Sequence, residues 1–452
     1  MSDLAEKLAR LRGISGLVRG TAALDEQPTD KPVARRRRAR GVEVLVDGQV
    51  VDTPHGACFV REVAYAGETV RSRYALRDCL TQRVDELARL YPDAHLDRFD
   101  FARAVFLDTE TSGLAGGAGA YAFMVGVGAF EDRPRSGAPS TGDWPTEAAP
   151  PTTPAQPAES HFVVRQFFMR HEGEERALLH ALAEVLDRHS GVVTFNGRAF
   201  DLPLLSNRFI MQRQPPRLTD APHLDLLHPA RRLWRGRLPS CALGNLEIEI
   251  LGLQRDQADV PGWLIPNLYF RYLQTGDASD LVGVFYHNHE DILSMVTLAT
   301  HLAHLFADPW REETLYALDV AALAWSYDRA GRLADAERAY QHALSHTLPD
   351  DIARLTYSRY AQFLKRQGRF AEAATVWQAW ITGVGGAVVE PYVELAKYYE
   401  WHTSDLEAAL MWTRWAEHEV QSWRPSPARR TALAELQHRA ARIERKLAGS
   451  AG

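Results

Sequence analysis

The hydrophobic pattern divides the chain into stretches of different character, beginning with a short helix. Residues 1–17 carry leucine or isoleucine at every third or fourth position, which predicts an amphipathic helix. We expect it to pack against its own chain, because short isolated helices are marginal; binding to a partner is the alternative. Residues 25–40 contain the run Arg35–Arg38 and predict a solvated or disordered linker, with a phosphate-binding arm as the alternative.

Residues 41–99 are interpreted as a small β-containing region. The Asp47-Gly48 pair predicts a β-hairpin over Val42 to Asp52, since Asp-Gly favours a type I′ turn. The pattern assigns no function to this region.

From residue 100 to residue 306, apolar runs and amphipathic stretches predict one α/β domain. The predicted elements are strands at 104–107, 120–130 and 161–169, a helix at 174–189, a strand at 191–195, a helix at 201–211 and a strand at 224–227. The first three strands have no helices between them and the later ones alternate with helices, so we expect a mixed sheet with helices on its faces. Residues 133–159 are rich in Pro, Ala, Ser and Thr and predict a disordered insertion.

After Trp310 the pattern is helical and repeats itself. Two segments align at a spacing of 37 residues, which places Gly331 in correspondence with Gly368. A turn glycine and small residues at helix crossings are typical of tetratricopeptide repeats, so we predict such helical repeats over residues 313–447. The last amphipathic helix, at 427–447, is expected to cap them.

Composition and charge narrow the class of protein. The 452 residues are 46% hydrophobic and carry a net charge of −6, which excludes a protein that coats nucleic acid by bulk charge but leaves room for a local basic groove. Three widely spaced cysteines support neither a disulfide framework nor a zinc site, and they favour a reducing, cytoplasmic location. The longest apolar run has 13 residues, fewer than the roughly 18 that a membrane span needs. We therefore expect no membrane association.

Candidate chemistry begins at the end of the first strand of the α/β domain. Asp108 and Glu110 lie two residues apart, so a strand places both carboxylates on one face. In apolar surroundings such a pair needs a cation, although an exposed strand end is the alternative. Asp201 stands at a helix start, where capping is the simpler role. His287 and Asp291 are four residues apart and share one helix face.

Taken together, these segments resemble the DEDD (DnaQ-like) exonuclease superfamily, whose fold is ribonuclease H-like. The segments that match its three motifs, in order, are Asp108–Glu110, Asn196–Asp201 and His287–Asp291. A closer resemblance is to the YprB family, which includes the mitomycin repair factor B exonuclease. It covers about residues 100–305 and rests further on residues 223–225, 238–243, 246–247 and 260–266, and the helical C-terminus is also similar.

The resemblance implies an α/β fold, a ribonuclease H-like mixed sheet with flanking helices, followed by an all-α tetratricopeptide-like repeat domain. It also implies four metal ligands, which are Asp108, Glu110, Asp201 and Asp291. Their hard oxygen atoms suit Mg²⁺ or Mn²⁺, and two such ions clamp the scissile phosphate in enzymes of this chemistry.

The general base is the point at which this chain departs from the superfamily. One subgroup has a tyrosine four positions before the last aspartate, and another has a histidine five positions before it. Here His287 holds the first position and Tyr286 the second. We favour His287 as the base, because imidazole accepts a proton near neutral pH, and a packing role is its alternative. Tyr286 is expected to pack or to orient water.

Basic residues gather where a nucleic acid would run. The arginines within one stretch of thirty residues are Arg208, Arg213, Arg217, Arg231, Arg232, Arg235 and Arg237. A solvated helix face is the alternative, but arginine favours bidentate phosphate contacts, and Trp234 or Trp263 is available to stack on a base. The residues expected to contact nucleic acid are Leu114, Asn196, Arg198, Arg231, Arg232, Arg235 and Arg237.

These inferences converge on a metal-dependent 3′→5′ exonuclease acting on single-stranded DNA or 3′ ends. An RNA-processing nuclease of the same chemistry is one alternative, because phosphates and metal geometry are common to both substrates. A repeat scaffold with a relic nuclease fold is another, and retention of all four carboxylates argues against it. By resemblance, a DEAH-type helicase is the expected partner of the repeats.

Overall fold

The computed structural model describes residues 39–113, 119–133, 159–255, 259–312, 315–384 and 388–450. The predicted helix at 1–17, nearly all of the linker at 25–40 and the interior of the insertion at 133–159 lie outside the described residues.

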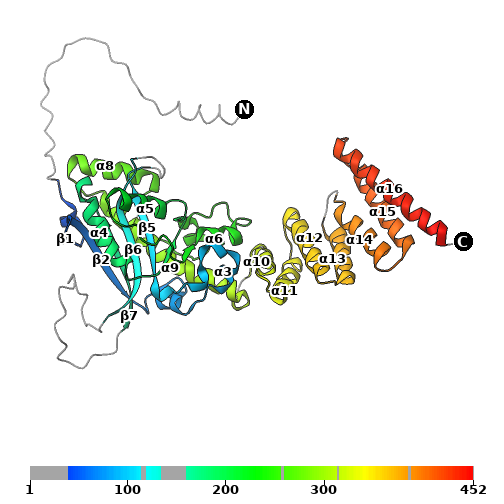
Figure 1. Cartoon of the computed structure of the whole chain (residues 1–452), viewed down its shortest axis with the longest axis horizontal. Coiled ribbons are helices and arrows are strands. Elements are labelled where there is room, and N and C mark those ends of the chain that lie inside the picture. The colour runs from blue at the N-terminus through cyan, green and yellow to red at the C-terminus, as the bar shows by residue number, and fades with distance from the viewer. Residues whose placement is uncertain are drawn as a thin grey trace, which may run out of the picture. The chain divides into compact units, whose positions relative to one another are not determined.

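A seven-stranded mixed sheet forms the centre of the fold, with strand order β1-β2-β7-β6-β5-β8-β9 (Figure 1). Its strands are β1 (Gln49–Thr53), β2 (Gly56–Ala66), β5 (Ala104–Thr111), β6 (Ala122–Arg133), β7 (Glu159–Phe168), β8 (Gly191–Thr194) and β9 (His223–Asp225). The pairs from β1 to β5 are antiparallel, whereas β5, β8 and β9 run parallel. The predicted mixed sheet is confirmed.

The region 41–99 supplies two strands of this sheet. β2 pairs with β7 over eight residues, from Phe59 opposite Phe168 to Ala66 opposite His161. These residues therefore build the central sheet together with the α/β domain. The remainder of the region holds the two-stranded pair β3 (Val70–Arg71) and β4 (Tyr74–Ala75), the helix α3 (Asp85–Leu90) and the 3₁₀ turns η1 (Leu76–Thr81), η2 (Pro92–Ala94) and η3 (Leu96–Arg98). The 3₁₀ turn η4 (Phe101–Arg103) follows it and leads into β5.

The hairpin predicted over Val42 to Asp52 is wrong. Val42–Leu45 forms the short helix α2, whose first residue, Val42, is fully buried in the core. Gly48 is needed for close packing instead of a turn, since a Cβ atom there would lie 2.6 Å from the Phe59 ring. The hairpin turn lies between β1 and β2, where Thr53 Oγ1 bonds to the backbone of Gly56, whose φ is +110°.

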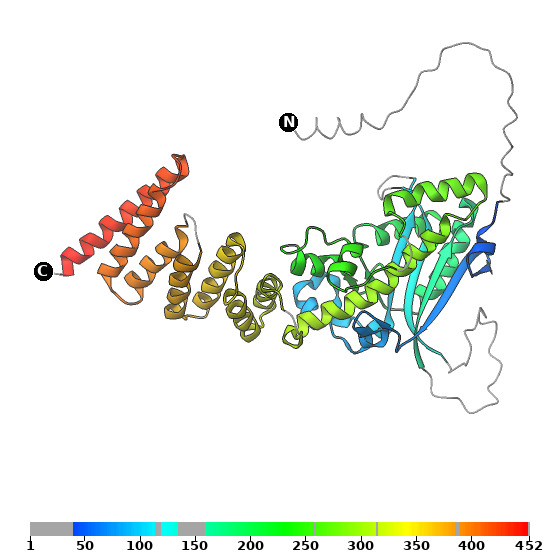
Figure 2. The same ribbon diagram turned by 180° about the vertical axis from the view of Figure 1, so that it is seen from behind.

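Helices cover both faces of the sheet (Figures 1 and 2). On β5, Val105 and Leu107 pack in the core with α4 (Glu175–Leu186), and Phe106 packs on the opposite face with α9 (Leu281–Ala307). The remaining helical elements of this part are η5 (Glu172–Glu174), α5 (Asp201–Met211), α6 (Leu227–Trp234), α7 (Leu243–Glu249), η6 (Gly262–Leu264), α8 (Ile265–Thr275) and η7 (Pro309–Arg311). The α4 and α5 predictions are confirmed.

Two glycines of β6 allow α9 to lie close against the sheet. A Cβ atom at Gly126 would lie 2.3 Å from Asn288 Oδ1, and one at Gly128 would lie 2.6 Å from Ile292 Cγ2. Glycine inside a strand marks such close approaches. The 27-residue α9 therefore crosses the sheet at short range and carries polar side chains to its edge.

The C-terminal part is built from packed helices, as predicted. Its elements are α10 (Ala317–Ala330), α11 (Leu333–Leu344), α12 (Asp350–Arg366), α13 (Phe370–Gly383), α14 (Glu390–Trp401), α15 (Leu406–Gln421) and α16 (Pro427–Ser450). Each helix packs against the next in sequence. The two glycines that correspond in sequence, Gly331 and Gly368, follow α10 and α12 with φ of 76° and 75°, so both end a helix in the left-handed conformation that glycine favours.

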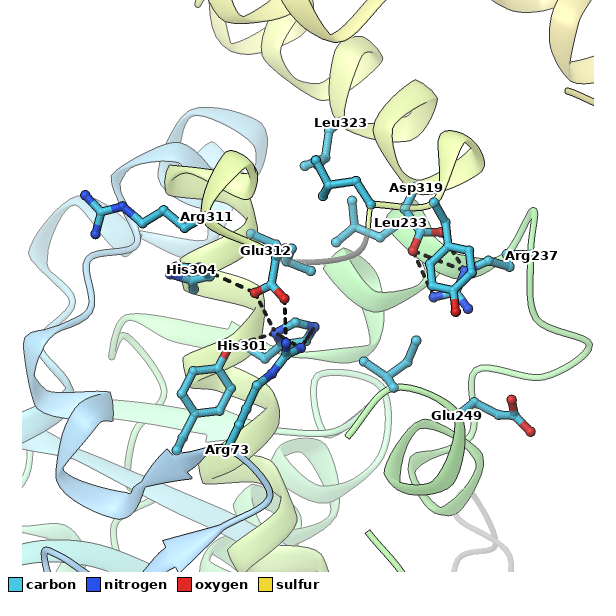
Figure 3. A pocket seen from close by; sticks show the side chains of 15 residues that line it. Arg73, Leu233, Arg237, Glu249, His301, His304, Arg311, Glu312, Asp319 and Leu323 are labelled. Atoms are coloured by element: carbon cyan, nitrogen blue, oxygen red, sulfur yellow. Dashed lines mark hydrogen bonds and ion pairs between the residues drawn. The ribbon is translucent and has the colours of Figure 1, made fainter. Parts of the chain in front are cut away.

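The first helix of this part shares its core with the ribonuclease-like part. α10 packs against α6 and α3, and the ion pair between Arg237 and Asp319 (2.8 Å) joins the two. Figure 3 shows the adjoining pocket, a cavity of about 620 Å³ in which Arg73 and His304 both lie against Glu312. Within the described residues, no helix combines the length and the apolar character needed to cross a membrane.

Candidate active site

Four carboxylates approach one another at the end of β5. Asp108 and Glu110 lie on the face of β5 that α9 covers, and Glu110 is only 8% exposed. Asp291 is carried by α9, and Asp201 is the first residue of α5. Thr109, the residue between the β5 pair, donates its hydroxyl hydrogen to Asp201. Three separate segments of the chain therefore deliver these side chains to one place.

Asp225 holds the turn that presents Asp201. Its two carboxylate oxygens accept hydrogen bonds from the backbone N–H groups of Asn196 (2.8 Å) and Arg198 (3.1 Å). Asn196 has a φ of 69°, in the left-handed region where asparagine is tolerated. Because Asp225 ends β9, the sheet itself fixes the position at which α5 begins.

A buried chain of amides positions Asp108. Asn288 on α9 donates its side-chain N–H to Asp108 Oδ2 (2.8 Å), and its own oxygen accepts from Gln166 of β7 (2.9 Å). Gln166 in turn accepts from Arg61 of β2 (2.7 Å). Asn288 and Gln166 are both fully buried. Buried amides with satisfied hydrogen bonds have fixed orientations, so this chain holds the Asp108 carboxylate in one rotamer.

The carboxylates oppose one another's ionisation. Burial raises the pKa of Asp108 well above its usual range, and the charges of Asp291 and Asp201 raise it further. Burial and the Asp108 charge do the same for Glu110. Burial raises the pKa of Asp201 to about 6, although its hydrogen bond from Thr109 acts in the opposite direction. Such a set of carboxylates lacks balancing positive charge, because like charges share a desolvated site.

Among the described residues, Arg255 brings a positive charge into this cluster of carboxylates. Its guanidinium bonds to both oxygens of Glu247 (2.9 and 2.8 Å), pairs with Asp291 and reaches Asp259 (3.1 Å). Its side chain is 10% exposed. Burial raises the pKa of Asp291, whereas His287 and Arg255 lower it. One guanidinium does not balance this many carboxylates, so the site retains an excess of negative charge.

The donor set fits a divalent ion with hard oxygen ligands. The side chains that would hold it are Asp108, Glu110, Asp201 and Asp291. No three His, Cys, Asp or Glu side chains stand ready as a closed metal cage in the part of the chain that the structure describes. Arg255 and Asn288 contact oxygens of Asp291 and Asp108 in this structure.

His287 lies beside the carboxylates. Its Nδ1 lies 2.7 Å from Asp259 Oδ1 and 3.3 Å from a guanidinium nitrogen of Arg255, and its Nε2 lies 3.6 Å from Asp291 Oδ2. In the tautomer whose Nδ1–H donates to Asp259, Nε2 is the basic nitrogen and faces the site. Tyr286 also lies within α9, which begins at Leu281, so it does not precede the helix as a loop residue. On a helix it is turned away from the face that carries Asp291.

The residues expected to contact nucleic acid fall into several environments. Arg198 is exposed in the turn beside Asp201, whereas Asn196 is half-buried in that turn. Arg231 and Arg235 are exposed at the C-terminal end of α6. Leu114 lies outside the described residues.

Other members of the basic and aromatic set serve the fold. Arg232 donates to the Tyr91 hydroxyl (3.1 Å), and Arg237 forms the ion pair with α10 described above. Arg208 and Arg217 pair with carboxylates of α4 and its C-terminal end. Trp234 is buried in the core, which removes it from base stacking, but Trp263 is 78% exposed.

Sequence reasoning missed the residues that support the carboxylates. Arg255 and Asp259 precede the 260–266 segment, Asn288 lies inside the His287–Asp291 motif, and Gln166 lies in the largely apolar sequence of β7. A polar residue in a buried run is a usable signal, since it needs a hydrogen-bonding partner. The identity of that partner depends on the packing of α9 against β6 and β7.

Comparison with known proteins agrees with this geometry. Residues 155–303 match the family model of the RNase_H superfamily, a stretch that includes Asp201 and Asp291 and begins after β5. With the mixed sheet, this match shows that the chain contains a ribonuclease H-like domain, a class whose nucleases generally use divalent metal ions. The chain is also 29% identical over 363 residues, 78% of each chain, to the uncharacterized protein YprB of Bacillus subtilis (strain 168). The chain therefore carries a ribonuclease H-like domain and is similar to YprB over most of its length.

Proposed function

We propose that this protein is a DEDD-type exonuclease that hydrolyses DNA from the 3′ end with the help of two divalent ions. The observation that supports the proposal is the meeting of four carboxylates from β5, α5 and α9 at one place, two of them buried and two partly buried, in a ribonuclease H-like fold. A structural role does not explain them, because clustered carboxylates repel one another and the Arg255 guanidinium pairs with one of the four, Asp291.

The chain's own residues divide the work. Asp108, Glu110, Asp201 and Asp291 would hold two Mg²⁺ or Mn²⁺ ions. Bound there, such ions supply activation of the attacking water and neutralisation of the leaving 3′ oxygen. His287 would accept the proton of the attacking water at Nε2, with Asp259 holding the ring by its Nδ1–H.

Its cellular role belongs to the same proposal. The helices α10–α16 would dock a protein partner, and a helicase of the DEAH type fits the resemblance because it would supply single strands for digestion. We propose a cytoplasmic role in DNA repair on that basis. Three free cysteines among the described residues are compatible with a reducing compartment.

The deciding experiment is digestion of end-labelled single- and double-stranded DNA and RNA with Mg²⁺ or Mn²⁺. The proposal expects mononucleotides to be released stepwise from 3′ ends of DNA. Preferential digestion of RNA would show that the protein is an RNA-processing nuclease of the same chemistry. If the wild-type protein cleaves none of these substrates, the result would contradict the proposed nuclease activity and favour a repeat scaffold with a relic nuclease fold.

The Asp108→Asn variant tests the site directly. We expect it to lose cleavage while remaining folded, because it removes one charge from a repulsive cluster and one ligand from the ions. Mn²⁺ should raise the melting temperature of the wild-type protein, since binding to the folded state at a hundredfold excess over Kd contributes about 2.7 kcal/mol. The variant should show a much smaller rise. A variant that digests DNA in Mn²⁺ as fast as wild type would remove Asp108 from the site.

A further inference from the structure

A second basic feature lies at the junction of the two parts of the chain. A groove of about 330 Å³ runs between the C-terminal end of α6 and the helices α10 and α12. Its floor is apolar and its rim is basic; the lining residues are Arg231, Arg232, Leu233, Arg235, Gly236, Leu318, Ala322, Trp325 and Ile352. We call it the α6 groove.

The arginines of the α6 groove differ from their neighbours in having no carboxylate partner. Arg231 and Arg235 are exposed, and neither guanidinium forms an ion pair with another described residue. Arg359 of α12 adds a fourth positive charge beside Arg231, Arg232 and Arg235, because its guanidinium lies 4.2 Å from the centre of the Trp325 ring. The acidic Asp350, near the groove on α12, is already paired with an arginine of its own helix.

The nearby pocket in Figure 3 shows the contrasting case. There Arg237 is paired with Asp319, and Arg73 with Glu312, so the positive charges are neutralised inside the protein. Both cavities adjoin α6 and α10. The α6 groove therefore combines an apolar floor with arginines that have no carboxylate partner among the described residues, and this combination indicates an anionic ligand with apolar surfaces.

The chain leads directly from the candidate active site to this groove. α6 begins two residues after Asp225, the residue that holds the turn before Asp201. The eight residues of α6 cover about 12 Å, at a rise of 1.5 Å per residue. Exposed Arg198 stands at the site end of this path, and Arg231 and Arg235 stand at the groove end.

We propose that the α6 groove binds a single strand of nucleic acid whose terminus lies in the candidate active site. The arginines would contact phosphates, and the apolar floor with Trp325 would receive bases. This inference rests on the proposed function for the identity of the ligand. An acidic peptide offers comparable charge, but the path along α6 to a phosphodiester-cleaving site favours nucleic acid.

The test measures binding and cleavage separately. Binding of a labelled DNA strand of about 20 nucleotides, longer than the roughly 4–16 that one single-strand site covers, is followed by anisotropy in the non-cleaving Asp108→Asn background. We expect the double variant Arg231→Glu with Arg235→Glu to bind more than tenfold more weakly. Replacing both arginines by Ala should lower the salt dependence by about two phosphate contacts. Arg424→Glu, at an exposed arginine between α15 and α16, is the matched control and should bind as the background does.

Cleavage distinguishes the groove from the active site. With the catalytic residues intact, the double glutamate variant should lose much more of its cleavage rate on the long strand, at sub-saturating concentration, than on a dinucleotide. Equal loss on both substrates, or unchanged binding of the long strand, would overturn the groove proposal. Loss of binding to an acidic peptide with unchanged DNA binding would overturn it in favour of a protein ligand. If the wild type cleaves nothing, the proposed function fails, while the anisotropy result still decides whether the groove binds DNA.

Discussion

Arg255 places one guanidinium between Glu247, which is buried, and Asp291, which is one of the four carboxylates of the site. A carboxylate that ligates a metal is held in place by a further hydrogen bond, and loss of such a bond typically costs 10–100-fold in metal affinity. Arg255 contacts one oxygen of Asp291, and the other oxygen faces His287 Nε2 at 3.6 Å. We infer that Arg255 is a positioning residue for Asp291.

Arg255→Gln should therefore weaken Mn²⁺ binding by about 10–100-fold, measured by calorimetry. Because the change also leaves the buried Glu247 unpaired, Arg255→Gln combined with Glu247→Gln is the necessary companion variant. The double variant should recover the melting temperature without recovering the metal affinity. Tighter Mn²⁺ binding in either variant would show that Arg255 competes with the ions instead.

His287 and Tyr286 make a second test at the residue scale. His287→Ala should slow cleavage by about 10²–10⁴-fold at saturating Mn²⁺, the usual contribution of a general base, or about 3–5 kcal/mol of barrier. Metal binding should persist. Tyr286→Phe should cost less than about tenfold, because it keeps the ring and removes only a hydroxyl. The opposite ranking would assign the base to Tyr286, and equal losses would indicate shared positioning of water.

The residue scale also shows what a sequence can reveal about a site. The four carboxylates could be predicted because each stands in a local motif at the end of a strand or on a helix face. Their supports could not, because Gln166 meets Asn288 across 122 positions of the chain. Arg255 reaches Asp291 across 36. Tertiary packing decides which of these residues meet, and the local spacing of residues along the sequence does not reveal it.

At the scale of elements, the contact between β6 and α9 governs the site. Gly126→Ala would place a methyl group 2.3 Å from Asn288 Oδ1 and displace the amide that holds Asp108. We expect cleavage to fall by about 100-fold, the effect of a small misplacement of a reacting group. The added volume should also destabilise the fold by about 1–3 kcal/mol.

Gly128→Ala is the matched control for that prediction. Its methyl group would meet Phe162 and Ile292, which are apolar, and would strain the same interface without touching Asn288. Melting temperatures and cleavage rates, both measured well below the transition, separate the two effects. Equal activity in the two variants would show that Asn288 does not position Asp108.

The elements themselves were predictable where the pattern is local. Strands β5 to β9 and helices α4 and α5 follow from apolar runs and helical spacing, because each is a continuous stretch with its own period. The partnership of β2 with β7 was not predictable, since these strands are about a hundred residues apart. The Asp47-Gly48 pair led to a wrong hairpin prediction, because Gly48 makes room for the Phe59 ring. Thr53 and Gly56 form the turn between β1 and β2 instead.

At the scale of the whole molecule, the helices α10–α16 cannot be removed at the start of α10 without disturbing the rest of the chain, because α10 shares a core with α6. Val320, Leu323 and Tyr327 of α10 belong to the same buried cluster as Leu233 and Trp234 of α6. The later helices contact mainly their neighbours, and Ala416, Val420 and Leu436 form a cluster of their own. Stability in such a stack is close to a sum of neighbouring interfaces. The position of a truncation therefore decides its effect.

We expect a chain ending at residue 384 to fold and to cleave a short oligonucleotide at nearly the wild-type rate. It retains α10 to α13 and hence the core shared with α6 and the α6 groove. A chain ending at residue 312 should lose about 3–5 kcal/mol, or roughly 10 °C in melting temperature, because Arg237 loses Asp319 and the buried face of α6 is uncovered. Thermal melts and short-substrate assays of the two truncations distinguish these cases. Complete loss of cleavage in a folded chain that ends at residue 384 would instead show that α14–α16 take part in catalysis.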